Sequence, residues 1–487
     1  MALHTRREFL EDSMLAATAA LAGSAMAAPL FAEQASNSPN ETLRVAVLGV
    51  NGRGQDHLNG FEKRPGCEVA AIVDPDETVG RTKGVARVES KTGKKPAYYA
   101  DLRKVLDDPS IDVISIATPN HWHSLAAIWA MQAGKDVYVE KPVSHNVSEG
   151  RRAVQAARKY NKICQTGTQC RSMGGTIQAI EYVKSGKIGE VKLARGLCYK
   201  PRGSIGARGK YEVPAGVDYD IWCGPAPMNP LTRPRFHYDW HWQWDAGNGD
   251  LGNQGIHQMD IARWGLGVDD IGTAVLSYGG RFGYEDAGDT ANSQVSIHTY
   301  GDKTLVFEVR GLKTDALNGA KVGVIFYGTE GYVVLSSYDT GAAFDLNGKM
   351  IKQFKAAGDH YGNFVSAVRN RKPEELNADI LEGHLSSALC HLGNISYRLG
   401  EPVTVAEAKE RLHHVANRTE AEQTFERFVQ HLKDNKVDVN STKITMGPSL
   451  TIDPKTETFT GSRAAEANPM LTREYRAPYV VPAEGAV

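Results

Sequence analysis

Two short segments of the chain combine residue types that could carry out chemistry. One contains Glu140, Lys141 and Pro142, and the other spans residues 118–123, where the residues of interest are Thr118, Pro119, Asn120 and His123. A lysine can hydrogen-bond a substrate oxygen and stabilise charge while a hydride is transferred. The alternative for Lys141 is a surface cation paired with Glu140. Pro142 is a candidate for a cis peptide bond, because cis bonds occur almost entirely before proline.

Both segments follow short apolar runs, residues 113–117 and 136–139, that are typical of buried strands. Earlier strands are expected at 43–48 and 68–73, and helical patterns occur at residues 54–63, 101–107, 122–133 and 147–160. This alternation of strand and helix predicts an α/β fold with a doubly wound parallel sheet over residues 43–165. Such sheets bind ligands at the carboxyl ends of their strands, which is where both segments lie.

The first strand runs into a glycine-rich turn made of Gly49, Asn51, Gly52, Arg53 and Gly54. A strand, a glycine turn and a helix together present backbone N–H groups and a positive helix end to a pyrophosphate. Asn51 replaces the middle glycine of the usual pattern. Asparagine tolerates positive φ better than most residues, but its side chain crowds the place where backbone meets phosphate.

Asp74 ends the second strand, where a carboxylate can accept hydrogen bonds from the ribose hydroxyls of a dinucleotide. We therefore expect a bound NAD or NADP, held tightly enough to remain with the protein. A carboxylate disfavours a 2′-phosphate, so NAD is the favoured form. Arg53 and Arg81 are candidates to accept NADP instead, and surface charges are the alternative for both.

Beyond residue 165 the alternation fails. Strand-like runs follow one another with few helices between them, at residues 191–199, 272–279, 293–300, 304–310, 322–327 and 331–336. They predict a second, α+β domain over 166–447 with a large, mostly antiparallel sheet. Helical patterns occur at 359–371 and 379–399. Residues 448–487 are rich in proline and threonine, which indicates an extended C-terminal arm lying on its own or a neighbouring subunit.

Taken together, these features resemble the glucose-fructose oxidoreductase / inositol dehydrogenase (Gfo/Idh/MocA) family. The resemblance covers nearly the whole chain after its N-terminal segment, and it is carried by the glycine turn and by residues 117–120, 140–142, 222–225 and 253–260. It implies a Rossmann domain, a C-terminal sheet domain that covers the cofactor, a homo-oligomer, and oxidoreduction of sugars, polyols or related molecules.

The resemblance also implies that Lys141 and His257 form the reaction centre. The family has an aspartate four residues before the histidine, but this chain has Asn253, so a proton relay through that position is in doubt. We expect Asn253 to bind substrate or orient His257. A neutral imidazole could remove a hydroxyl proton; the alternative is a buried or helix-capping histidine. Asp260 shares the helical face of His257 and is a candidate to orient it.

Residues 235–245 interleave aromatic and polar side chains, a pattern that suits carbohydrate because sugar C–H faces pack on rings. The alternative is an aromatic subunit interface. We take as candidate substrate-binding residues Arg171, His237, Trp240, His241 and Trp244. The two histidines could share a metal if the segment were helical, but no further ligands follow with motif spacing, so no metal is expected.

Length and charge limit the remaining possibilities. A chain of 487 residues is too long for a single hydrophobic core. Its 56 basic and 57 acidic residues leave a formal charge of -1, so no overall field would attract nucleic acid. The six cysteines contain no Cys-x-x-Cys pair and are expected to be buried or free thiols.

The N-terminal segment carries Arg6 and Arg7 before an alanine-rich run, which predicts a twin-arginine signal peptide over residues 1–32 and a linker over 33–42. The alternative is an N-terminal membrane anchor. A twin-arginine signal implies recognition by the twin-arginine export machinery and delivery of the folded protein, with its cofactor, to the periplasm.

Three functions are consistent with these features. The first is an exported NAD(P)-dependent oxidoreductase that transfers hydride between a CH–OH group of a sugar or polyol and nicotinamide. The second is an NAD-dependent glycoside hydrolase that oxidises C3 transiently and retains its cofactor. The third is a non-catalytic sugar-binding protein. The presence of both Lys141 and His257 argues against the third function.

Overall fold

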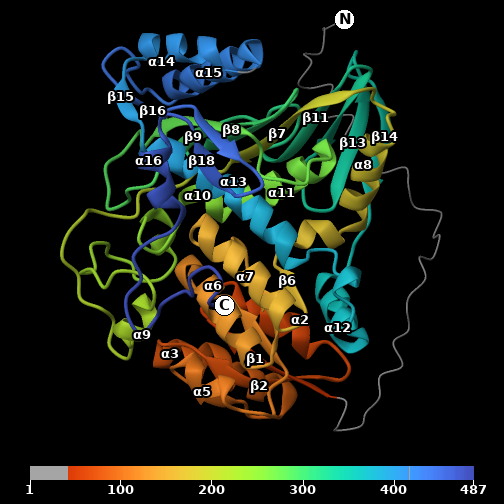
Figure 1. Ribbon diagram of the computed structural model, residues 1–487, viewed down its shortest axis with the longest axis vertical. Helices are drawn as coiled ribbons and strands as arrows, with labels where there is room; N and C mark the ends of the chain where they lie inside the picture. The colour runs from red at the N-terminus through yellow and green to blue at the C-terminus, as the bar shows by residue number, and fades with distance from the viewer. Residues whose placement is uncertain (1–41, 416) are drawn as a thin grey trace, which may run out of the picture.

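The computed structural model describes residues 42–415 and 417–487, so the predicted signal peptide and nearly all of the linker lie outside the described residues. Two sheets dominate the molecule, one in each domain (Figure 1). Within the described residues, no helix is both long enough and apolar enough to span a membrane.

The first domain is built on a six-stranded parallel sheet with strand order β3-β2-β1-β4-β5-β6. Its strands are β1 (Leu43–Leu48), β2 (Cys67–Val73), β3 (Ala97–Tyr99), β4 (Val113–Ile116), β5 (Asp136–Val139) and β6 (Cys164–Thr166). Its helices are α2 (Gly54–Glu62), α3 (Glu77–Val79), α4 (Ala86–Thr92), α5 (Leu102–Leu106), α6 (Asn120–Gln132) and α7 (Val147–Lys159). This arrangement confirms the doubly wound sheet, and its order reverses between β1 and β4, where such folds bind ligands.

The second domain contains a twelve-stranded mixed sheet, which confirms the predicted large, mostly antiparallel sheet; within it only β7 and β10 are recorded as a parallel pair among the described strands. The first eight strands are β7 (Val191–Tyr199), β8 (Ala274–Gly280), β9 (Ser293–Tyr300), β10 (Lys303–Arg310), β11 (Val322–Gly328), β12 (Gly331–Leu335), β13 (Thr340–Asp345) and β14 (Met350–Lys355). The last four are shorter: β15 (Glu401–Val403), β16 (Ile444–Met446), β17 (Leu450–Asp453) and β18 (Thr458–Thr460).

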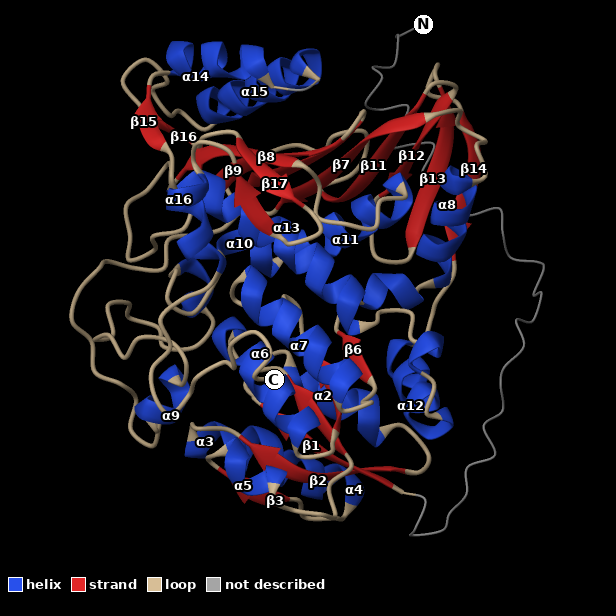
Figure 2. Cartoon of the chain, in the orientation of Figure 1, coloured by secondary structure: helices blue, strands red, loops and turns tan. Residues whose placement is uncertain are grey.

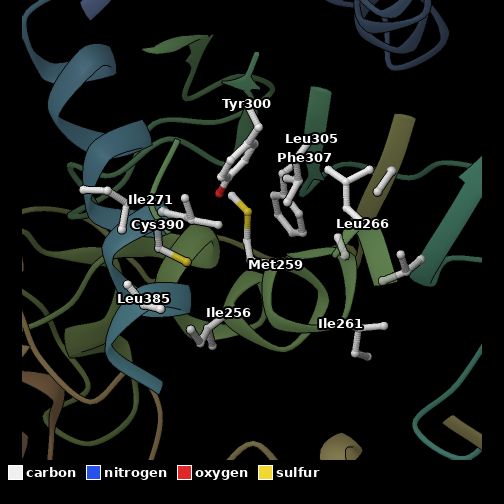
Figure 3. Packing of buried hydrophobic residues seen from close by; sticks show 14 of the residues in the cluster. Ile256, Met259, Ile261, Leu266, Ile271, Tyr300, Leu305, Phe307, Leu385 and Cys390 are labelled. Atoms are coloured by element: carbon white, nitrogen blue, oxygen red, sulfur yellow. The ribbon is translucent and has the colours of Figure 1, made fainter. Parts of the chain in front are cut away.

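Helices cover both faces of the large sheet (Figure 2). α8 (Gly174–Lys184), α11 (Gly255–Leu266) and α13 (Ile380–Arg398) lie on the side of the first domain, while α14 (Val405–Arg411) and α15 (Arg418–Asp434) pack on part of the opposite side. α11 buries Ile256 and Met259 against Phe307 of β10 and Cys390 of α13 (Figure 3). Each fully buried side chain of this size contributes about 1.5–3 kcal/mol, so α11 is anchored firmly beneath the sheet.

One helix that follows the second domain's sheet in sequence packs against the first domain. α12 (His360–Asn370) follows the large sheet in sequence, but its Phe364 and Val368 pack in the core of the first domain with Val45 and Phe61. The assignment of residues 166–447 to the second domain stays a prediction, but the apolar face of α12 is buried by the first sheet, a partner that the sequence order does not reveal.

The C-terminal residues are only partly extended. Residues 448–460 contribute β17 and β18 to the large sheet, and α16 (Ala464–Ala467) follows, which corrects the prediction of an extended arm over 448–487. The last residues return to their own chain rather than leaving it. Tyr479 packs edge-on against Trp122, with ring centroids 5.5 Å apart, and its hydroxyl donates to Asp220.

Candidate functional site

A cleft of about 340 Å³ opens at the carboxyl edge of the parallel sheet. Its opposite wall comes from the long segment between β7 and α10 (Gly249–Asn253), which includes α9 (Tyr219–Cys223). Most of the predicted cofactor residues line it: Gly49, Asn51, Gly52, Arg53, Asp74, Thr118, Pro119, Asn120, His123, Glu140 and Lys141. Several wall residues were not predicted as site residues, among them Pro75, Trp122, Ile221 and Tyr238.

The glycine turn at one end of the cleft requires glycine at two positions. Gly49 has a φ of 78°, and a Cβ there would lie 2.8 Å from the carbonyl oxygen of Ala117. A Cβ on Gly54 would lie 1.9 Å from the carbonyl oxygen of Gly49, so the helix begins directly against the turn. Asn51 does not adopt a positive φ, so its backbone in this turn is not strained. Its Oδ1 accepts a hydrogen bond from Nζ of Lys83 at 2.7 Å.

Asp74 lies at the carboxyl end of β2, as predicted. Its Oδ2 accepts from the backbone N–H of Val50 at 2.9 Å, and its Oδ1 accepts from that of Asp76 at 3.0 Å. Burial raises the pKa of Asp74 to about 6. His237 also lies at this end, where its Nε2 is 2.9 Å from Asp76, so it faces the ribose end of the cleft rather than Lys141.

Arg53 lies at the other end of the cleft. Its Nε donates to Glu140 at 2.7 Å, and Glu140 also lies 3.2 Å from Nε2 of His57. Because Glu140 follows β5, three strands away from β2, Arg53 is directed away from Asp74. Of the two arginines considered for NADP, Arg81 lies nearer the ribose end, where it packs over the ring of Tyr98.

Lys141 lines the cleft and is joined to Pro142 by a cis peptide bond. Its Nζ donates to the backbone carbonyl of Asn253 at 2.7 Å, and burial lowers its pKa. From Lys141, Glu140 accepts only the backbone N–H, at 3.2 Å, and not the side-chain amine. The alternative of a surface cation paired with Glu140 therefore does not match the structure.

A break between two helices supplies the carbonyl that binds Lys141. α10 ends at Asn253 and α11 begins at Gly255, so the carbonyl of Asn253 is available to the lysine. α10 is held by a bidentate ion pair in which Arg202 donates to both oxygens of the buried Asp250, at 2.8 and 2.6 Å. Asn253 therefore contributes its backbone, and its side chain also lines the cleft.

His257 lies on α11, behind the wall of the cleft and not among the residues that line it. It is 4% exposed, and its Nδ1 is buried without a hydrogen-bond partner among the described residues. Its ring centroid is 5.0 Å from that of Tyr338. Burial, followed by the charge of Lys141, holds the pKa of His257 well below its usual range.

The predicted roles of Asp260 and Arg171 are wrong. Asp260 accepts from Nε of Arg171 at 2.8 Å and from Oγ of Ser386 at 2.7 Å, so it does not orient His257. Arg171 also donates to Glu382 at 2.8 Å and does not line the cleft. Both side chains are buried in an ion-pair network that ties α11 to α13.

His241 lines the cleft and lies close enough to Lys141 to feel its charge. Its ring stacks on Trp240 with centroids 3.6 Å apart, and its Nδ1 donates to the backbone carbonyl of Tyr238. Its Nε2 is therefore the unprotonated nitrogen of a neutral ring, and burial lowers its pKa to about 3. Tyr238 has a φ of 67° and a side chain 53% exposed, a strained conformation of the kind found at functional sites.

Of the remaining predicted residues, His123 holds parts of the cleft together, whereas Trp244 lies outside the cleft. His123 links the two motifs through contacts of 2.8 Å with the carbonyl of Thr118 and 2.6 Å with that of Pro142. Trp244 does not line the cleft and faces a second cavity. In the part of the chain that the structure describes, no cluster of three or more histidine, cysteine or acidic residues is placed to hold a metal.

Two models of one protein family match this chain. The model described as oxidoreductase family, NAD-binding Rossmann fold, matches residues 43–168, and the model described as oxidoreductase family, C-terminal alpha/beta domain, matches residues 202–433. Together they account for more than two thirds of the sequence. The chain belongs to the Gfo/Idh/MocA family.

Curated relatives in this family resemble the chain over part of their length. Levoglucosan dehydrogenase from Pseudarthrobacter phenanthrenivorans is 31% identical over 179 residues, which are 37% of this chain and 39% of that protein. A glycosyl hydrolase family 109 protein from Shewanella baltica is 30% identical over 203 residues, 38% of this chain and 44% of that protein. The matched region thus spans less than half the length of either relative.

Solved structures share the fold of the Gfo/Idh/MocA chain. The WlbA dehydrogenase from Bordetella pertussis, in complex with NADH and UDP-GlcNAcA, has a TM-score of 0.53 and 17% identity over 72% of this chain and 96% of that one. Aldose-aldose oxidoreductase from Caulobacter crescentus, complexed with glycerol, has a TM-score of 0.55 and 16% identity over 72% and 97%. At these identities the likeness shows the fold alone.

The cleft fits the NAD-binding role of its family. Gly49 and Gly54 form a cradle that any Cβ would fill, and the hydroxyl of Thr118 is buried in the cleft wall without a partner among the described residues. Asp74 presents a carboxylate at the ribose end. The glycine cradle suits a pyrophosphate, the Thr118 hydroxyl can form a hydrogen bond with the dinucleotide, and the Asp74 carboxylate suits a ribose.

The raised pKa of Asp74 predicts that NAD affinity depends on pH. We expect affinity to weaken as the pH falls through about 6, because protonation removes the negative acceptor that the ribose hydroxyls need. Asp74→Asn should bind NAD about tenfold more weakly and lose this pH dependence. Fluorescence titration between about pH 5 and pH 8 measures both effects. A constant affinity of the unaltered protein over this range would contradict the assignment of Asp74.

Proposed function

We propose that this protein is an NAD-dependent oxidoreductase that acts on a CH–OH group of a sugar or polyol. The observation that carries the proposal is that one cleft contains the glycine turn, Asp74 and Lys141 together with an aromatic wall at Trp240. When bound, the nicotinamide supplies the hydride acceptor. The residues of the chain must then orient the alcohol and take its proton.

Lys141 is the best candidate to take that proton. An efficient general base has a pKa near the working pH. Burial lowers the pKa of Lys141 below its ordinary value, which favours the neutral amine, whereas burial lowers that of His241 to about 3, away from neutrality. Lys141 in its neutral form can accept the hydroxyl proton, while its Nζ stays positioned by the hydrogen bond to the carbonyl of Asn253.

The aromatic wall supports a carbohydrate substrate. Trp240 and Tyr238 line the cleft on the side facing Lys141, and Trp240 is backed by the stacked ring of His241. Flat rings pack on the C–H faces of sugars, and neighbouring polar groups bind the hydroxyls. The similarity to levoglucosan dehydrogenase agrees with this class of substrate.

A glycoside hydrolase with a retained NAD is the second candidate, favoured by the similarity to several glycosyl hydrolase family 109 proteins. Its cycle would oxidise C3 of the sugar, eliminate the aglycone across C1 and C2, add water at C1 and return the hydride to C3. Export supports retention of the cofactor, because free NAD is scarce outside the cytoplasm. We infer export through the twin-arginine route from Arg6, Arg7 and the alanine-rich run.

One experiment tests both candidates. The purified protein is denatured and its supernatant assayed for NAD and NADP by absorbance and mass, and the native protein is then offered aldoses, polyols and chromogenic glycosides. Net NADH formation with a sugar supports the oxidoreductase, and release of the chromophore without net NADH supports the hydrolase. Failure to bind or retain either dinucleotide, by titration as well as by extraction, would exclude both.

Export and assembly need separate measurements. Replacement of Arg6 and Arg7 by lysine should leave the protein in the cytoplasmic fraction, and secretion unchanged by this replacement would exclude the twin-arginine route. We propose a homo-oligomer on the strength of the family resemblance, and light scattering of the purified protein tests this by giving its mass relative to the 53.0 kDa chain.

A further inference from the structure

A second cavity, of about 280 Å³, lies where both domains meet the C-terminal residues. Its lining comes from four parts of the chain: His145 and Asn146; Trp244, Asp245 and Asn248; His391, Asn394, Ile395 and Arg398 of α13; and Pro469, Met470, Thr472 and Arg473. Asn248 connects it to the cofactor cleft. The Oδ1 of Asn248 accepts from Asn120, which lines the cleft, and its Nδ2 donates to the carbonyl of His145.

Two arginines converge on this cavity without a carboxylate partner. The guanidinium of Arg398 lies over the ring of Trp244, 5.2 Å from its centroid. Arg473 donates to Nδ1 of His145 at 3.1 Å and to the backbone carbonyl of Asp245 at 3.0 Å. Within the described residues neither guanidinium forms an ion pair. Arg398 is exposed and Arg473 is half-buried, so both guanidinium groups have N–H donors that a ligand in the cavity can reach.

The histidines of the cavity add no charge. His145 accepts from Arg473 through Nδ1, so its Nε2 must donate to the carbonyl of Gly247, 3.2 Å away, and the ring is neutral. His391 is 3% exposed, its Nδ1 lacks a partner among the described residues, and burial lowers its pKa to about 3. Asp245 is the one acidic residue in the lining as described. Two positive charges and one negative charge therefore lie in the lining, and the carboxylates of Glu149 and Asp289, outside the lining, interact electrostatically with Arg473 and Arg398 respectively.

We propose that this cavity binds a sugar acid, that is, a molecule the size of a monosaccharide with one carboxylate. The fork of a guanidinium matches the two oxygens of one carboxylate. Trp244 offers a flat apolar face for sugar C–H groups. A phosphate dianion would instead place surplus negative charge beside Asp245. The volume lies near the lower limit of small-molecule sites, which suits a single sugar unit.

Calorimetric titration of the full chain, in the presence of excess NAD, tests the proposal with D-glucuronate as probe. D-Glucose is the neutral control with the same ring, and inorganic phosphate is the dianion control. We expect saturable binding of glucuronate and at least about tenfold weaker binding of glucose and phosphate, because both lose the charge-assisted contacts.

Variants locate the site. Arg398→Gln should weaken glucuronate binding about tenfold or more, and Trp244→Leu should weaken it independently of charge. Arg418→Gln is the matched control. The substitution removes the same charge, but Arg418 lies away from the cavity, where it pairs with Glu422 on the exposed side of α15. Lys141→Met should leave glucuronate affinity unchanged, which separates this cavity from the cofactor cleft.

Three results would overturn the proposal: no saturable binding of glucuronate by the unaltered protein, equal affinity in Arg398→Gln, or tighter binding of phosphate than of glucuronate. A loss of glucuronate binding in Lys141→Met would also overturn it, because the ligand would then occupy the cofactor cleft. Circular dichroism spectra of Arg398→Gln and Trp244→Leu confirm that any loss reflects the site rather than the fold.

Discussion

Replacing Lys141 with methionine should reduce kcat/KM by about 10²–10⁴-fold, the usual contribution of a positioned general acid or base. Methionine keeps the length of the side chain and its apolar stem but removes the amine that donates to the carbonyl of Asn253. Affinity for NAD should change by less than about threefold, because the cradle formed by Gly49 and Gly54 and the carboxylate of Asp74 stay intact. Initial rates of NADH formation and NAD titrations measure the two quantities.

Lys141→Arg separates the role of the base from that of the charge. Arginine keeps the positive charge but does not lose its proton under these conditions, so its activity should fall as far as that of Lys141→Met. The matched control is Lys433→Met, which alters an exposed lysine on α15. Near-normal activity in Lys141→Arg would show that Lys141 acts through its charge alone.

The rate of the unaltered protein should also depend on pH. A base works in its unprotonated form, and burial lowers the pKa of Lys141. We therefore expect log kcat/KM to rise as the pH is raised toward the depressed lysine pKa and then to level off, and this rise should be absent in the residual activity of Lys141→Met. A rate that falls with rising pH would contradict a role as base.

The sequence predicted the elements whose pattern is local. β1 and β2 contain unbroken runs of four and five buried apolar residues, and β9 and β10 of the large sheet carry a short alternating pattern and a short apolar run. β3 and β6 have three residues each, too few for a periodic signal. The short strands β15–β18 and the helices α14 and α15 were not predicted for a different reason. Their apolar faces are recognisable only against the sheet that buries them.

In the candidate site too, residues with a local sequence signal were predicted and residues with distant partners were not. Gly49, Asp74 and Lys141 were predicted because each lies at a fixed position relative to a strand end. The errors concern side chains with partners far away in sequence. Helical spacing placed Asp260 beside His257, but it could not show that Arg171, 89 residues earlier, takes up that carboxylate.

Aromatic spacing had the same limit. It identified residues 235–245 as a unit, but the chain folds this segment so that its members separate: Trp240 faces the cleft and Trp244 the second cavity. Tyr238 was overlooked because its importance lies in its backbone conformation, for which tyrosine gives no sequence signal.

The largest effect on stability is expected from Glu308, on the outer face of the large sheet. This carboxylate is fully buried and accepts hydrogen bonds from Arg195, from Arg310 at 2.8 Å, from Arg427 at 3.0 Å and from the hydroxyl of Tyr199 at 2.9 Å. Burial alone would raise the pKa of Glu308, but the three guanidinium groups together lower it well below its usual range. The carboxylate is therefore the central anion of a cluster of cations.

Glu308→Gln should lower the free energy of unfolding of the second domain by about 3–5 kcal/mol, because removing one partner leaves buried charge uncompensated. Arg427 belongs to α15, so the change should also loosen the docking of α15 on the sheet. The midpoint of urea unfolding measures the first effect, and hydrogen exchange along α15 measures the second.

Glu426→Gln is the matched control on the same helix. Glu426 is 60% exposed in a pair with Lys409, and such surface pairs contribute at most about 1 kcal/mol. NAD affinity of Glu308→Gln should be normal at low temperature, since the first domain has its own core. If the urea midpoints of the two variants shifted equally, the cluster around Glu308 would be no more than a surface network, and the docking of α15 would have to rest on its apolar residues Phe425 and Phe428 alone.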